Sequence, residues 1–295
     1  MGSDRDAVED LRRFFQASYF PDVNQEKIQK QTPAEPDPDT PEEFTRRGDA
    51  LAAEGEIGQA IEHYRKAVQL GGQQARPHTR LADAYVYTEN SARAISQYKK
   101  AINVAPDDAE PHFGLAELYR RFGRIKAAIR EYRIANYLDK KNAFYRYRLA
   151  DALTQAGYLR DALVEMTHAV EISPDDSFYR FWLAELHLRQ GNHEDAVRQL
   201  EVAAELATQD DYYHLRLGAL YLQTGQAEKA VRSIRNAIRI RPENGSYKQI
   251  LGEIYLHLGR EEAANVCYEF AGALDAYDHD FVRRFRGRRQ THSKR

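Results

Sequence analysis

One stretch of the chain decides the fold. Residues 109–142 read AEPHFGLAELYRRFGRIKAAIREYRIANYLDKKN, and the preceding residues 75–108 read ARPHTRLADAYVYTENSARAISQYKKAINVAPDD. The two 34-residue segments align without a gap, and they share leucine, tyrosine and two alanines at positions 7, 24, 20 and 27. A fixed period of this length indicates a repeat array rather than one globular core.

Extended in both directions, the same register divides residues 41–278 into seven segments with no insertion. The segments are 41–74, 75–108, 109–142, 143–176, 177–210, 211–244 and 245–278. Positions 20 and 27 are alanine in all seven segments, and position 8 is always glycine or alanine. Leucine at position 7 and glycine at position 15 each recur in six of the seven.

These spacings predict two helices in each segment. Apolar or small residues at positions 4, 7, 8 and 11 share one helix face, and positions 20, 24 and 27 form a similar stripe on a second helix. Glycine at position 15 lies between them, where the chain must turn. Neither helix can bury its apolar face alone, so each hairpin must stack on the next.

The period and the recurring residue types resemble those of the tetratricopeptide repeat family. The leucine row, the alanine rows, the tyrosines at positions 11 and 24 and the prolines at position 32 all match its pattern over residues 41–278. The departure is at position 4, which never holds the family's frequent tryptophan; from residue 143 on, a tyrosine one place earlier is expected to take over its packing role. The resemblance implies an all-α, right-handed α-solenoid whose concave groove binds proteins, and it implies no catalysis.

The two ends of the chain have their own patterns. Residues 1–40 predict a short amphipathic helix followed by an acidic, proline-containing linker, and the helix either covers the first repeat or docks into a partner. The motif Thr40-Pro41-Glu42-Glu43 predicts a capped helix start. Residues 279–295 predict a capping helix and a basic tail. The basic residues singled out there are Arg283, Arg284, Arg286, Arg288 and Arg289.

The groove face is predicted to carry a binding site. If positions 4, 7, 8 and 11 face the second helix, positions 2, 5, 9, 12 and 13 face the groove. Position 9 is acidic in six segments, and these carboxylates either bind a ligand or pair with nearby arginines. Positions 2 and 5 become aromatic in the middle segments, and they either bind a ligand or seal the contact with the preceding repeat. The candidate groove residues are Phe113, Glu117, Phe144, Tyr147, Asp151, Phe178, Phe181, Trp182, Glu185 and Tyr212.

Composition excludes several other classes of protein. No apolar run approaches the roughly 18 residues of a membrane span. The single cysteine, Cys267, excludes an internal disulfide, and the ten histidines lack metal-ligand spacing, so neither a metal nor another cofactor is expected. No motif for a catalytic nucleophile, a phosphate-binding loop or a metalloprotease is present, so the chain is not expected to be an enzyme.

The expected function is therefore a non-catalytic scaffold or adaptor that holds a peptide or protein element in its groove. The acidic and aromatic residues there suit a partner with basic and apolar residues, and no small-molecule substrate is expected. The alternative is a structural subunit bound permanently within a larger multi-subunit enzyme complex. A third hypothesis is nucleic-acid binding through the basic tail, and the acidic groove argues against it. A cytoplasmic location is expected, because no signal peptide is recognisable.

Overall fold

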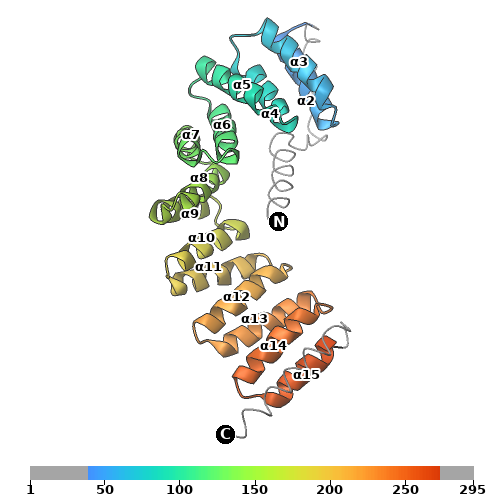
Figure 1. Ribbon diagram of the computed structural model, residues 1–295, viewed down its shortest axis with the longest axis vertical. Helices are drawn as coiled ribbons and strands as arrows, with labels where there is room; N and C mark the ends of the chain where they lie inside the picture. Colours follow the sequence, from blue (N-terminus) through green and yellow to red (C-terminus); the bar gives the residue numbers. More distant parts are fainter. Residues whose placement is uncertain (1–38, 273–295) are drawn as a thin grey trace, which may run out of the picture. The chain divides into compact units, whose positions relative to one another are not determined.

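The computed structural model describes residues 39–272, and this range contains fourteen α-helices joined by short turns, without a strand. Successive helices pack in pairs (Figure 1). The first helices of the pairs are α2 (Pro41–Ala53), α4 (Ala75–Tyr87), α6 (Ala109–Arg121), α8 (Ala143–Gln155), α10 (Ser177–Arg189), α12 (Asp211–Gln223) and α14 (Gly245–His257). The second helices are α3 (Ile57–Leu70), α5 (Ser91–Val104), α7 (Ile125–Leu138), α9 (Leu159–Ile172), α11 (His193–Leu206), α13 (Ala227–Ile240) and α15 (Glu261–Gly272). The predicted fold class, an all-α helical-repeat solenoid, is confirmed.

Each first helix begins at the first residue of a predicted segment, and in six of the seven the preceding side chain caps it; Gln74, before α4, makes no such hydrogen bond. Thr40 Oγ1 accepts a hydrogen bond from the Glu43 amide at 3.2 Å, with Pro41 in the first turn, as the sequence predicts. Asp108 caps α6 in the same way, accepting from the Glu110 amide at 3.0 Å. Such caps satisfy amides that have no partner within the helix.

The turns between paired helices explain the glycine row. Position 15 adopts a positive φ in each of the six segments where it is glycine, between +69° and +85°. The second segment has Glu89 there, with a φ of +60°, and it is the only non-glycine residue with positive φ among residues 39–272. A side chain in this left-handed region costs free energy, so the second turn is strained relative to the other six.

The alanine rows form the contacts between helices. All fourteen alanines at positions 20 and 27 are fully buried, with 0% exposure. The small residues at position 8 lie beneath the side chain at position 24: a Cβ added to Gly48 would lie 2.5 Å from Tyr64 Cε1. Since protein interiors are close-packed, larger residues at these positions would force the helices apart.

The first turns of the first helices are filled as the sequence predicts. His78 and His112 at position 4 are buried in the packing. Of the tyrosines expected to replace the missing tryptophan, Tyr179, Tyr213 and Tyr247 are buried, whereas Tyr145 is half-buried. The buried residues are therefore part of the core.

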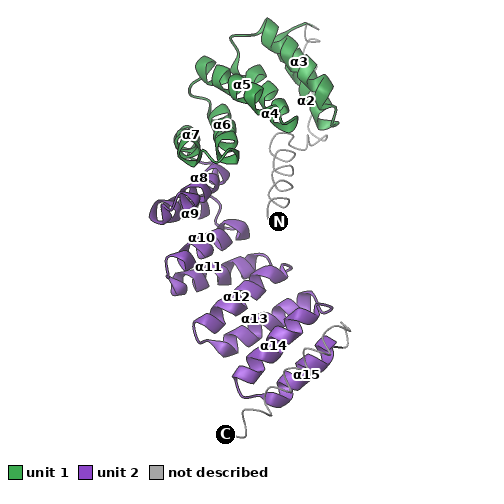
Figure 2. Cartoon of the chain, in the orientation of Figure 1, with its two compact units in different colours: residues 1–140 green, residues 141–295 purple. Residues whose placement is uncertain are grey.

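The helices fall into two compact units, a division that the regular 34-residue period does not predict (Figure 2). Unit 1 covers residues 1–140, and its described part contains α2 to α7. Unit 2 covers residues 141–295, and its described part contains α8 to α15. The predicted N-terminal helix and linker, the capping helix and the basic tail with Arg283, Arg284, Arg286, Arg288 and Arg289 lie outside the described residues.

Candidate binding surface

Six aromatic side chains of unit 2 form a continuous set of ring contacts, which we call the aromatic row. Its members lie on α8, α10 and α12: Phe144, Tyr147, Phe178, Phe181, Trp182 and Tyr212. The ring centroids of Tyr147 and Phe178 are 4.9 Å apart, and those of Phe181 and Tyr212 are 5.5 Å apart. Trp182 joins the two pairs, with centroid distances of 5.8 Å to Tyr147 and 5.6 Å to Phe181. The spacing and tilt of these rings are those that aromatic pairs prefer.

The aromatic row packs on buried tyrosines, and two of its rings are exposed to solvent. Phe178 and Tyr212, both at position 2, are 40% and 47% exposed, and the remaining four rings are half-buried. Tyr179 and Tyr213 lie beneath and are buried, and burial, with the nearby Asp176 charge, raises the pKa of Tyr179 to about 12. Large apolar groups that stay exposed on a rigid base are typical of a contact surface for another molecule.

The acidic residues at position 9 have a different role in unit 1. Asp49 accepts a hydrogen bond from the Tyr64 hydroxyl at 2.8 Å, and Asp83 accepts one from Tyr98 at 2.6 Å. Glu117 accepts one from Tyr132. In each case the tyrosine occupies position 24 of the same segment, so the first three acids are acceptors for a core phenol. The predicted local pairing with arginine occurs at Asp83, 3.4 Å from Arg80.

Two predicted groove residues are consequently corrected. Phe113 is 1% exposed because its ring packs against that of Tyr132, with centroids 5.7 Å apart. Glu117 is 6% exposed because it is held by the Tyr132 hydroxyl and by Arg120 at 3.2 Å. Both side chains are part of the interior of unit 1, and neither is accessible to a ligand.

The two acidic candidates of unit 2 lack such a tyrosine, because position 24 is Met166 in the fourth segment and Leu200 in the fifth. Glu185 instead forms an ion pair with Arg216 from the next first helix. Asp151 accepts a hydrogen bond from the neutral side chain of Gln155 at 3.0 Å, and it forms no ion pair within residues 39–272. Asp151 is therefore the candidate carboxylate whose charge remains available.

The described residues give no indication of a metal or membrane site. Across residues 39–272, no group of three histidine, cysteine or acidic side chains has a geometry that would hold a metal ion. Within the same range, each helix is too short or too polar to span a bilayer. Cys267 is half-buried, and burial raises the pKa of its thiol, which disfavours the reactive thiolate.

An array of stacked helix pairs with a 34-residue period defines the class of α-helical repeat proteins. Sequence profiles described as tetratricopeptide repeat or TPR repeat match residues 48–88, 79–143, 153–221 and 215–280. The chain therefore belongs to the tetratricopeptide repeat family. Members of this family are typically non-catalytic scaffolds for protein–protein interaction.

Solved structures with the same fold include three of different origin. The C-terminal part of a TPR repeat-containing protein from Cytophaga hutchinsonii has a TM-score of 0.67 and 16% identity, covering 79% of this chain and 95% of that one. Pseudomonas aeruginosa pilF has a TM-score of 0.59 and 16% identity, covering 72% and 97%. YrrB, described as a TPR protein with an unusual peptide-binding site, has a TM-score of 0.54 and 22% identity, covering 68% and 99%. A search of curated protein sequences found no significant match.

Proposed function

We propose that the aromatic row binds an extended or helical element of a partner protein, and that the chain acts as a scaffold or adaptor. The observation that carries this proposal is the exposure of Phe178 and Tyr212 within a continuous set of six aromatic contacts. Aromatic residues on a rigid support are the side chains that most often dominate binding energy at protein interfaces. The peptide-binding site described for YrrB makes a peptide a reasonable class of ligand for the same fold.

The preferred ligand would present apolar side chains to the rings and a lysine or arginine to Asp151. Glu185 contributes less, because Arg216 already neutralises it. A cation from the ligand would also contact the faces of electron-rich rings, which attract positive charge. These features favour a basic, apolar segment over an acidic one.

The test uses a selected peptide rather than an unidentified partner. A random peptide library displayed on phage is panned against the full chain, and the selected sequences are synthesised. Their affinity is measured by the emission of Trp182, the only tryptophan of the chain, which should shift as the rings are covered. Selected sequences rich in aromatic or aliphatic residues with lysine or arginine are expected.

The variant that examines the surface is Phe178→Ala with Tyr212→Ala. Both side chains are partly exposed, so the fold should be retained, while loss of two anchors should weaken binding by at least tenfold. The matched control is Phe270→Ala on α15 of the same unit, which is 62% exposed and lies outside the aromatic row. Unchanged affinity in the double variant would exclude this surface as the binding site.

A further inference from the structure

A second row of contacts connects the two helices within the second to fifth repeats, between position 4 and position 23. His78 Nδ1 lies 2.6 Å from Gln97 Oε1, and His112 Nδ1 lies 2.8 Å from Glu131 Oε2. The same pairing recurs at 2.9 Å between Arg146 and Glu165 and at 3.2 Å between Arg180 and Gln199. In the second to fifth repeats, therefore, a long polar side chain on the second helix satisfies the residue at position 4.

The sixth repeat lacks this contact between the side chains at positions 4 and 23. Position 4 is His214, but position 23 is Ser233, whose side chain is too short to reach the imidazole. The Ser233 hydroxyl instead donates to the His214 backbone carbonyl at 2.9 Å. Among residues 39–272, the imidazole of His214 makes no hydrogen bond or ion pair.

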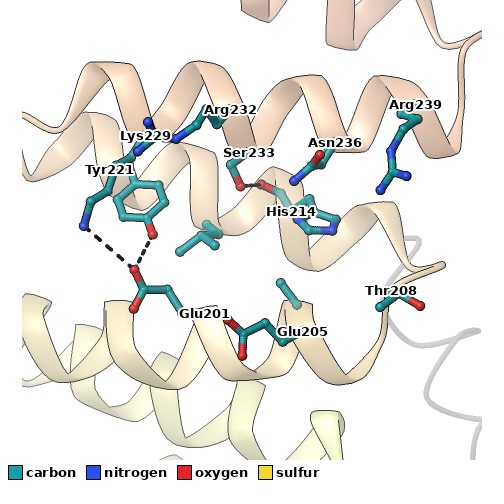
Figure 3. Close-up of a pocket in the computed structure, with 12 residues that line it drawn as sticks. Glu201, Glu205, Thr208, His214, Tyr221, Lys229, Arg232, Ser233, Asn236 and Arg239 are labelled. Carbon is teal, nitrogen blue, oxygen red and sulfur yellow. Dashed lines mark hydrogen bonds and ion pairs between the residues drawn. The ribbon is translucent and has the colours of Figure 1, made fainter.

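The space that a longer side chain would fill is part of a pocket of about 470 Å³ between α11 and α13 (Figure 3). His214, Leu217 and Tyr221 of α12 line it together with residues of the two second helices. Its volume is comparable to that of small-molecule pockets, but the pocket is a groove that is open to solvent rather than an enclosed cavity. Tyr212 of the aromatic row and His214 are two residues apart, which is roughly 200° around a helix, so the pocket and the aromatic row lie on different sides of α12.

The two ends of the pocket differ in charge. At one end, Glu201 accepts from the Tyr221 hydroxyl and lies 4.0 Å from Lys229 Nζ, so its charge is already compensated. At the other end, Figure 3 shows Asn236 and Arg239 of α13 beside His214. Within the described part of the chain, neither Asn236 nor Arg239 has a hydrogen-bond or ion-pair partner through its side chain.

Burial and the nearby Arg239 charge both lower the pKa of His214, which favours the neutral form of its imidazole. A neutral imidazole offers one donor and one acceptor. Arg239, Asn236 and His214 line the same end of the pocket, and a guanidinium such as that of Arg239 matches the geometry of a planar carboxylate. Glu205, on the opposite wall, repels every anion, and it repels anions of higher charge more strongly than a single carboxylate.

We propose that the α11–α13 pocket binds a free carboxylate group that ends a small apolar body, either a small carboxylic acid or the C-terminal residue of a peptide. Arg239, Asn236 and His214 hold the carboxylate, and Leu217 and Ala204 contact its carbon chain. This assignment does not depend on the aromatic row, and it adds a ligand site to the scaffold.

The test titrates the full chain with N-acetyl-leucine and follows the imidazole of His214 by nuclear magnetic resonance, with the signal assigned from its absence in His214→Gln. Saturable binding that raises the pKa of His214 is expected, because a bound carboxylate stabilises the imidazolium. N-acetyl-leucine amide should have no such effect. An equal response to acid and amide, or no response to either, overturns the proposal.

Two variants and one control locate the site. Arg239→Gln should weaken binding at least tenfold, whereas Arg235→Gln, an exposed arginine of the same helix outside the pocket lining, should change it less than twofold. Ser233→Gln should restore the pairing seen between His78 and Gln97, fill the pocket and abolish binding. Unchanged affinity in both pocket variants would refute the assignment.

Two further ligands define the class and the source of the carboxylate. Inorganic phosphate binding as tightly as N-acetyl-leucine would refute the carboxylate preference. Acetyl-Ala-Ala-Ala-Leu with a free C-terminus binding more tightly than N-acetyl-leucine would identify a peptide terminus as the source. Equal or weaker binding of this peptide would identify a small molecule, and both results support the site.

Discussion

Gly114, in the middle of α6, is the position where we expect one added methyl group to lower the stability of the fold most. A Cβ built on Gly114 would lie 2.4 Å from Tyr98 Cζ and 2.6 Å from its hydroxyl oxygen. Ordinary contacts begin near 3.4 Å, so the ring would have to move by about 1 Å. Tyr98 is 1% exposed and its hydroxyl donates to Asp83 at 2.6 Å, so the ring is held in place on both sides.

The expected cost follows from three contributions. Overpacking of a buried contact costs about 1–3 kcal/mol. Distortion of the hydrogen bond to the half-buried Asp83 adds about 1.5–3 kcal/mol. Alanine is about 1 kcal/mol better than glycine inside a helix, which offsets part of this loss. Gly114→Ala should therefore destabilise the protein by roughly 2–5 kcal/mol, against the usual direction of a helical Gly→Ala change.

The assay is urea unfolding followed by far-ultraviolet circular dichroism, which detects all helices. The matched control is Gly58→Ala in α3, where an added Cβ meets nothing within 4 Å and only the helix propensity should change. The Gly58 variant should keep or raise the unfolding midpoint, while the Gly114 variant should lower it clearly. Equal midpoints in the two variants would refute the argument that Tyr98 fixes the residue at this position.

Three further predictions concern the same array. Glu89→Gly should raise the unfolding midpoint, because it removes about 1–2 kcal/mol of left-handed strain at the second turn, and a lowered midpoint would contradict this. Ala162→Leu on α9 should destabilise by about 1–3 kcal/mol, whereas Val164→Leu, which is 53% exposed on the same helix, should have little effect on thermal unfolding. Burial and the Glu110 charge raise the pKa of Asp83 to about 7, so Asp83 stabilises the fold fully below about pH 4 and loses this effect as the pH rises through 7. The unfolding midpoint of Asp83→Asn, measured relative to that of the unchanged chain, should accordingly rise from pH 5 to pH 8. A difference between the two midpoints that does not change with pH would contradict the raised pKa of Asp83.

The fold could be predicted from the sequence because the same residue types recur at the same positions of nearly every repeat. Alanine at positions 20 and 27 and glycine at position 15 are each required by local geometry, namely a close helix contact or a positive φ. Such requirements leave little choice of residue, so they appear directly in the sequence. The division into two units could not be predicted, because the 34-residue register continues unbroken through residue 140.

The binding surface could be predicted only in part, because side chains on one face of a helix can point to different neighbours. Phe113 and Phe181 both occupy position 5, yet Phe113 is buried and Phe181 is half-buried. The role of Glu117 was detectable in principle, since acids at position 9 accompany tyrosines at position 24 in the first three repeats. The α11–α13 pocket depends on Ser233 being shorter than the residues at position 23 of the four preceding repeats, a difference that becomes meaningful once the pairing is known.

The pairing between the phenol at position 24 and the acid at position 9 also constrains the order in which these residues can change during evolution. If the acid is lost first, a buried hydroxyl remains without an acceptor, at a cost of about 1–3 kcal/mol. If the tyrosine is lost first, the carboxylate can turn towards water or towards an arginine. The less costly route therefore passes through repeats like the fourth and fifth, which keep Asp151 and Glu185 above an aliphatic core, and ends in one like the sixth, with Ala219 and Ile234. Along such a route, the carboxylate that accepts a core hydrogen bond at Asp83 corresponds to one that is available for recognition at Asp151.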